Sequence, residues 1–531
     1  MPLSLPSRPS LDQLRKQAKD LLAAWRAGDA EALSWLREHH PEHAQATAAD
    51  PADSLRLADA QLVTARRYGF ASWPRLKSEV ELMGLAFDER ARRFVRAAAD
   101  ASSGTDEPFR LAKRLLERDP SLARADVYAA LVLGGVDAVR RQVERDPEWA
   151  RRKGGPYEDR EPLHYVTFSR FHRESPEIAE GSLEIARLLL DHGADPDAAF
   201  IQAPWTDSPL RPLYGACGLA NFPAMAELLL DRGATINDFE SLYHSQEHPD
   251  TRSLELLLAR GADPKGTNAL NHAMDYPGLE RIRLLLDHGA DPNEGVHFTP
   301  LHFAILRGRE RAALELLVKH GADVTRRVFG RSPYQAALQL GHVEAAEYLV
   351  SLGAETPATP LERFAEACGR GDLEAARRIA EENPGLFETL SDHDRAAFAH
   401  LAQLGKTAMI GAMIDAGFPV QAAGPSRQTA LHWASWHGWR ETVEALLSRG
   451  AVVDAVEEEH GGTPLVWAIH GSDNSPNPKG DYPGVVRLLL EAGADVTAVN
   501  LWKEATAADI RDPAVADLLR AAGVKDRPDE L

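Results

Sequence analysis

The sequence predicts an all-α solenoid, a stack of short helix pairs, and three observations lead to this prediction. A phrase of three apolar residues, a polar pair and Gly-Ala recurs at about 33-residue spacing. A second phrase, Thr or Ser followed by Pro and Leu, opens many of the same units. The chain has 531 residues, more than one hydrophobic core ordinarily serves, so a repeat array or several domains are expected.

The composition is that of a folded, soluble protein. Hydrophobic residues make up 44% and charged residues 26% of the chain, and the net charge is −20. This acidic balance argues against a general binder of nucleic acid or anionic membranes, and favours a basic partner. Cys217 and Cys368 are too few for a zinc cluster or a disulfide framework. Without a signal segment or an apolar run near the ~20 residues of a membrane helix, the expected location is cytoplasmic.

The closing phrase predicts where the second helix of each unit ends. Glycine adopts the left-handed conformation of a helix end freely, and Asn does so tolerably. The cationic residues before several of these glycines suit the negative end of the helix dipole, so the histidines among them are interpreted as caps rather than ligands. The phrase ends at Gly193, Gly233, Gly261, Gly289, Gly321, Gly353, Gly450 and Gly493, and more weakly at Asn383 and Gly417.

The opening phrase predicts where the first helix of each unit begins. It is clearest at 299–302, 429–432 and 463–465. Ser or Thr is a good N-cap, and Pro at the first helical position loses no hydrogen bond. Each unit is therefore a capped short helix, a turn, a second helix and an extended connector. We expect twelve such units between about residues 91 and 524, plus a short last helix pair.

The two phrases together resemble the ankyrin repeat, with its TPLHxA opening and LLLxxGADxN ending. The resemblance is strong over about 158–500 and degenerate over 91–157 and 360–424. It implies a curved stack with β-turn fingers and a concave groove that binds partners. It also implies that the opening-phrase histidines, His164, His302 and His432, are structural hydrogen bonders between repeats.

Residues 1–90 carry no such phrase and predict a small helical module. This stretch is similar to a helical segment that precedes many bacterial ankyrin arrays, which indicates a bacterial ankyrin-repeat protein. Because solenoid ends need covering, we expect the module to cap the first repeat. The predicted organisation is a module at 1–90, degenerate repeats at 91–157, repeats at 158–359, degenerate repeats at 360–424, repeats with a C-terminal cap at 425–524, and a disordered tail at 525–531.

Three irregular stretches interrupt this scheme. The weak middle at 360–424 is expected to let the array bend or pack as two halves. Insertions at about 167–182 and 470–484 are interpreted as polar surface loops, which either carry specificity or are simply tolerated.

Catalytic signatures are missing from the sequence: it has no GxSxG elbow, phosphate loop, HExxH or GxGxxG motif. The histidine pairs at 39/43 and 244/248 have i, i+4 spacing, but Pro41 breaks the first and the second lies in a loop-like stretch. Neither has the Cys or carboxylate set that zinc prefers. We therefore predict no catalytic residues, no cofactor and no metal, and a chain that is not an enzyme.

Function is predicted to lie in the groove of a monomeric protein-interaction scaffold that binds a protein or peptide. Trp436 matters most, because an exposed Trp is disfavoured unless a partner covers it and Trp is enriched at binding hot spots. The alternative is that Trp436 stacks on His470 or on the neighbouring insertion. Trp433 is expected to pack in the core. The family's groove positions correspond to Phe168, Leu219, Asp275, Tyr276, Leu306, Arg307, Gln339, Leu340, Trp436 and His437, to which we add His470.

Two other functions remain open at this point. One is an enzyme or small-ligand sensor with a pocket between the N-terminal module and the first repeats. A deep pocket with paired titratable groups would favour that function, and a broad open groove would favour the scaffold. The other is a purely structural role in an assembly.

Overall fold

The fold is described by a computed structural model. The described residues are 3, 5–6, 9–40, 55–70, 72–102, 106–202, 207–295, 298–354, 359–475, 477–501, 510 and 512–524. His43 and the tail at 525–531 lie outside them. The chain divides into two compact units: Leu85–Gly330, and Met1–Gly84 together with Arg331–Leu531. Within the described residues, three isolated β-bridges accompany the helices, and the predicted all-α class is confirmed.

The described residues up to Gly84 form a small helical module. Trp25 and Leu36 lie in its core with Val63, and the Trp25 indole N–H donates to the Ala32 carbonyl at 2.6 Å. The module belongs to the same compact unit as the C-terminal repeats, and Arg66 pairs with Asp517 at 3.6 Å. Its helices are α1 (Leu11–Arg26), α2 (Ala30–His39), α3 (Leu57–Arg67) and α4 (Trp73–Gly84).

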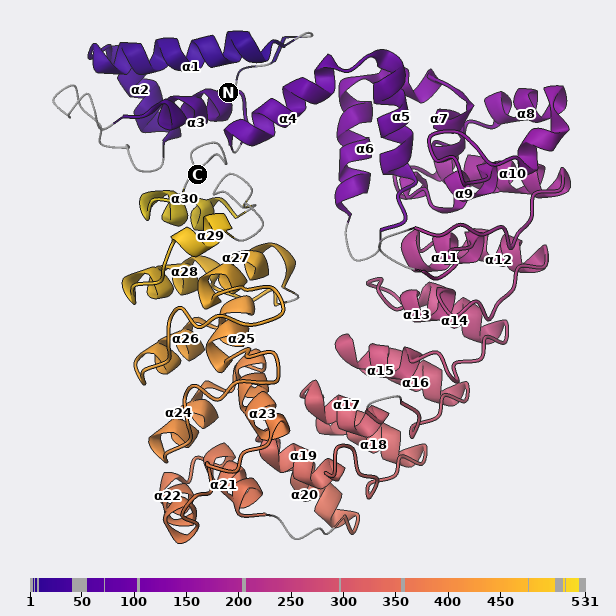
Figure 1. Cartoon of the computed structure of the whole chain (residues 1–531). Helices are drawn as coiled ribbons and strands as arrows, with labels where there is room; N and C mark the ends of the chain where they lie inside the picture. The colour runs from indigo at the N-terminus through magenta and orange to yellow at the C-terminus, as the bar shows by residue number, and fades with distance from the viewer. Residues whose placement is uncertain are drawn as a thin grey trace. The chain divides into compact units, whose positions relative to one another are not determined.

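In unit Leu85–Gly330 the helices follow one another in pairs, an opening and a closing helix per repeat, and successive pairs stack (Figure 1). The pairs are α5 (Phe87–Ala98) with α6 (Glu107–Arg118), α7 (Val127–Val132) with α8 (Val136–Arg145), α9 (Pro162–Thr167) with α10 (Pro176–Asp191), α11 (Pro212–Tyr214) with α12 (Pro223–Asp231), α13 (Ser241–His244) with α14 (Arg252–Ala259), α15 (Ala269–His272) with α16 (Glu280–Asp287), and α17 (Pro300–Leu306) with α18 (Arg311–Lys319).

The pairing continues in the second unit. The pairs there are α19 (Pro333–Gln339) with α20 (Val343–Ser351), α21 (Pro360–Gly369) with α22 (Leu373–Glu382), α23 (Asp392–Gln403) with α24 (Thr407–Asp415), α25 (Ala430–Trp436) with α26 (Arg440–Leu447), α27 (Pro464–Asn474) with α28 (Tyr482–Glu491), and the shorter α29 (Thr497–Leu501) with α30 (Pro513–Ala521). Among the helices in the described part of the chain, none combines the length and apolarity needed to cross a membrane.

The opening helices begin as the phrase predicts. Thr299 caps α17, where its Oγ1 accepts the His302 N–H at 3.4 Å and contacts Nδ1 at 2.8 Å. Two buried histidines reach the next connector, or finger: His164 Nε2 lies 2.9 Å from the Ala198 carbonyl and His432 Nε2 lies 3.2 Å from that of Gly462. Burial lowers the pKa of each to about 4. These two are therefore neutral hydrogen bonders between repeats, as the resemblance implied.

The closing helices end on left-handed glycines. Gly233 has φ +92° and Gly321 φ +96°. Nothing lies within 4 Å of a Cβ added at either position, so backbone conformation rather than space requires glycine there. Asn383 corrects the prediction: its φ is −126°, and Gly385 two residues later takes φ +86°. Asn383 instead donates from its side-chain amide to the Ile379 carbonyl at 2.7 Å.

The residues before these glycines cap helices and connect repeats. His192 Nδ1 lies 2.8 Å from the Leu188 carbonyl, and His288 makes the same contact with Leu284. Arg232 pairs with Asp191 of the preceding repeat at 2.7 Å. His192 and His288 are therefore helix caps, as interpreted from the sequence.

Both insertions are packed parts of the fold rather than simple polar loops. In the first, Arg170 pairs with Asp106 at 2.8 Å and Arg173 donates to the Leu219 carbonyl at 2.9 Å. The second begins as the last turns of α27, and Asn477 then donates to the His437 carbonyl at 2.6 Å. Arginine and amide groups in the two insertions donate to backbone carbonyls of neighbouring repeats. These hydrogen bonds hold the insertions against the repeats.

The division into units falls between Gly330 and Arg331, outside the predicted weak middle at 360–424. That stretch has an aromatic core of its own. The Phe387 ring lies 5.0 Å from Phe364 and 5.4 Å from Phe418, which in turn lies 4.6 Å from Phe398. Aromatic packing therefore holds these degenerate repeats within one unit.

Replacing Gly233 with Ala is expected to lower the free energy of unfolding by about 1–2 kcal/mol, because an L-residue is strained in left-handed backbone. Urea unfolding followed by circular dichroism measures this change. The control is Gly84→Ala, at a helical glycine that also has open space around it and should be neutral or slightly stabilised. Equal effects of the two substitutions would contradict the role assigned to φ.

Candidate binding surface

The predicted groove residues lie at or just beyond the ends of the opening helices, and four of them are buried. Phe168 packs 5.3 Å from Phe200, and Leu219, Leu340 and His437 are at most 8% exposed. The expectation that these four side chains are exposed is therefore wrong. At His437 the reason is the second insertion: Ser475 Oγ lies 3.3 Å from its Nδ1 and Asn477 contacts its carbonyl.

The other predicted residues are exposed or half-buried. Gln339 donates from its amide to Asp394 Oδ1 at 3.1 Å. Leu306 is half-buried at the end of α17, and Arg307 follows it. The structure brings only some of these residues together, in two clusters, one in each unit.

The first cluster, which we call the histidine–carboxylate ladder, joins three successive repeats of the unit Leu85–Gly330. His244 lies 3.2 Å from Glu240 and 2.6 Å from Glu247. His272 lies 3.7 Å from Glu247 and 3.3 Å from Asp275. Glu247 thus connects the repeats of α13 and α15.

The ladder ends on residues predicted for the groove. Arg307 Nε donates to Asp275 at 2.5 Å, and Tyr276 Oη lies 3.3 Å from His272 Nε2. The Tyr243 ring stacks on His272 with centroids 4.0 Å apart and planes 7° apart. Asp275, Tyr276 and Arg307, all predicted groove residues, therefore lie in one cluster and pair within the chain.

Opposite charges shift the ladder's pKa values strongly. Burial opposes the charged form of His244, but its two carboxylates overcome this and raise its pKa to about 9. Burial likewise opposes ionised Glu247, yet His244 and His272 hold its pKa at about 2. The pKa of His272 is raised and that of Asp275 lowered, against burial, by their partners. At neutral pH His244 is therefore positively charged and Glu247 negatively charged.

Sequence reasoning missed His244, Glu247 and His272 as members of one network. His244 was weighed only with His248, whose Nε2 instead contacts the Cys217 carbonyl at 2.8 Å. The available signal was the spacing of His and carboxylate three or four residues apart, which places both on one side of a helical turn. Within the described residues, no group of three or more His, Cys, Asp or Glu side chains is arranged to hold a metal ion.

The second cluster is aromatic and lies on α25 and α27; we call it the tryptophan cluster. The Trp467 ring lies 5.1 Å from Trp433 and 6.0 Å from Trp436, nearly perpendicular to both. The Trp436 ring lies 5.0 Å from that of His470. All four side chains are half-buried, so each keeps part of its ring at the surface. The alternative foreseen for Trp436, contact with His470, is what the structure has.

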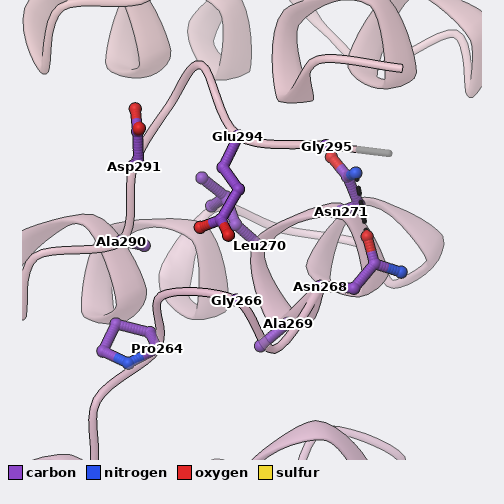
Figure 2. Close-up of a pocket in the computed structure, with 10 residues that line it drawn as sticks. All are labelled: Pro264, Gly266, Asn268, Ala269, Leu270, Asn271, Ala290, Asp291, Glu294 and Gly295. Atoms are coloured by element: carbon purple, nitrogen blue, oxygen red, sulfur yellow. Dashed lines mark hydrogen bonds between the residues drawn. The ribbon is translucent and has the colours of Figure 1, made fainter. Parts of the chain in front are cut away.

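A pocket of about 250 Å³ lies between two adjacent repeats, at α15 and the finger that follows α16 (Figure 2). Asn268, Leu270 and Asn271 form one side, and Asp291 and Glu294 belong to the other. None of its lining residues belongs to residues 1–90, where the alternative hypothesis sought one side of a pocket. Its remaining lining residues are Pro264, Gly266, Ala269, Ala290 and Gly295.

The ladder gives a pH dependence that can be measured. The folded pKa of His244, about 9, lies above its usual 6.5, so its contribution to stability is complete below pH 6.5 and is lost as pH rises through 9. Glu247→Gln is expected to return the His244 pKa toward 6.5, measured by NMR titration of the imidazole. Glu344→Gln, at an exposed carboxylate, is the control. An unchanged His244 pKa in Glu247→Gln would refute the coupling.

Comparison with known proteins identifies the family of these repeats. A family model described as "Ankyrin repeats (3 copies)" matches residues 241–328, 294–360 and 364–500, and a model described as "Ankyrin repeat" matches 160–199. Relatives include palmitoyltransferase Hip14 of Drosophila melanogaster, 29% identical over 23% of this chain and 18% of that protein. Ankyrin repeat and SOCS box protein 16 of Homo sapiens is 30% identical over 32% of this chain and 37% of its own length.

A third relative, B-cell lymphoma 3 protein of Homo sapiens, is 35% identical over 26% of this chain and 36% of that protein. The chain thus spans little more than a third of these relatives at most, and the palmitoyltransferase similarity lies in ankyrin regions. All three come from animals and give no support to a bacterial source. The two family models together match more than half of the 531 residues, on a fold of stacked helix pairs, and the chain belongs to the ankyrin-repeat proteins.

Proposed function

We propose that the chain is a non-catalytic, cytoplasmic interaction scaffold that binds a protein or peptide along its opening helices. Ankyrin repeats imply protein partners. The observation that carries the proposal is the tryptophan cluster: three Trp rings and His470 share one surface of two adjacent opening helices. Large, rigid aromatic side chains supply contact area at low entropic cost, and Trp is enriched among residues that dominate binding energy.

Charge specifies the kind of partner. Residues 425–496, which include the tryptophan cluster, contain ten Asp or Glu and five Lys or Arg. A basic protein or peptide is therefore favoured, chiefly through faster association at low salt. The contact between Trp436 and His470 does not weaken the proposal, because it fixes the indole while leaving part of its surface accessible. A bacterial source and a monomeric state belong to the same proposal, with the sequence as their support.

Trp436→Ala is expected to reduce partner capture from cell lysate about tenfold or more, the loss typical of a hot-spot aromatic. The full-length chain serves as bait, and quantitative mass spectrometry compares variant and wild type. Circular dichroism and thermal unfolding of the variant show whether the repeats remain folded.

The matched control is Trp35→Ala. Trp35 is also half-buried, lies in the N-terminal module and carries the Arg67 guanidinium 3.4 Å from its ring centroid. This variant should capture the same proteins as the wild type. An identical captured set for folded Trp436→Ala and wild type would remove the tryptophan cluster from the proposal.

A further inference from the structure

The pocket lies where α15 departs from the opening phrase. The repeats of α9 and α25 have a His whose Nε2 reaches the next finger, His164 and His432, and the repeat of α15 has Asn271 at that position. Its Nδ2 donates to the Phe298 carbonyl at 3.3 Å and to Asn268 Oδ1 at 3.0 Å. The asparagine side chain keeps the inter-repeat bond but is smaller than an imidazole, so space is left beside it.

Asn271 leaves one acceptor without a donor. The residue is 7% exposed, and its Oδ1 is buried with no hydrogen-bond partner among the described residues. In Figure 2 this oxygen points away from Asn268, toward the side on which Glu294 lies. A buried carbonyl without a donor destabilises the protein, and a ligand that brings a donor would relieve this cost.

The rest of the pocket favours a positively charged hydrogen-bond donor. Two of its ten lining residues, Asp291 and Glu294, are acidic and none is basic. Pro264, Leu270 and Ala290 supply apolar wall. At about 250 Å³ the space is smaller than the ~300–1,000 Å³ of sites for drug-sized ligands, and suits a single side chain or a small amine. An alkyl stem against the apolar wall with a cationic head at Glu294 fits this lining.

We propose that this pocket binds an alkylammonium group, either the side chain of a lysine in a partner or a free aliphatic amine. This proposal goes beyond the proposed contact at the tryptophan cluster, because the pocket lies in the other compact unit. The ammonium donates to Glu294, whose carboxylate lies over Gly266, and another of its N–H groups faces the inner wall that Asn271 forms. The Asp291 carboxylate accepts the Asn293 N–H at 2.8 Å and adds negative charge nearby.

The test uses the full-length chain with two probes, n-butylamine hydrochloride and the peptide acetyl-Gly-Lys-Gly-amide, observed by saturation-transfer NMR. The uncharged controls are n-butanol and the norleucine peptide. We expect at least one amine probe to bind about tenfold more tightly than its uncharged control, because a charged hydrogen bond replaces a neutral one. Binding of both amines identifies a site open to lysine side chains, and binding of n-butylamine alone identifies a small-amine site.

Two variants localise the binding. Asn271→His restores the residue that other repeats use, so it should keep the fold, fill the pocket and abolish binding. Glu294→Gln removes the carboxylate charge and should weaken binding about tenfold, whereas Glu344→Gln should leave it unchanged. Failure of both amines to bind the wild type, or equal binding by all variants, would overturn the proposal. Partner capture through Trp436 would be unaffected by that outcome, so the two proposals fail separately.

Discussion

The hydrogen bond from a buried side chain of an opening helix to the carbonyl of the following finger is the constraint that joins neighbouring repeats, and it is present at His164, Asn271 and His432. His164 and His432 make it as buried, neutral imidazoles. Their folded pKa values, about 4, lie below the usual 6.5, so their contribution to stability is complete above pH 6.5 and is lost as pH falls toward 4. His244 titrates in the opposite sense. Histidines that bond to carbonyls therefore make the fold less stable in acid. Histidines that pair with carboxylates make it less stable in alkali.

Much of the fold could be predicted because its determinants are local. A left-handed glycine such as Gly233 and an N-cap such as Thr299 specify helix ends within a few residues, and both phrases recur in order. Asn383 shows the limit of this reasoning. Its type permits the left-handed conformation, but its side chain bonds to the Ile379 carbonyl and Gly385 takes the turn instead.

The candidate surface was less predictable, because exposure depends on what neighbouring repeats and insertions cover. His437 occupies a groove position in the phrase, yet Ser475 and Asn477 of the second insertion fold over it. The ladder escaped prediction for a related reason. Glu247 gains its role only because stacking brings His272 of the next repeat within 3.7 Å, a distance that no spacing within one repeat encodes.

Local departures from the repeat are where this chain acquires features of its own. Trp436 and Trp467 enlarge the surface of two opening helices, and Asn271 opens a pocket while keeping the inter-repeat bond. The most direct measurement is amide hydrogen exchange of the full chain with and without its captured partner. Binding along the tryptophan cluster predicts slower exchange in α25 and α27. Slowed exchange confined to other helices would contradict it.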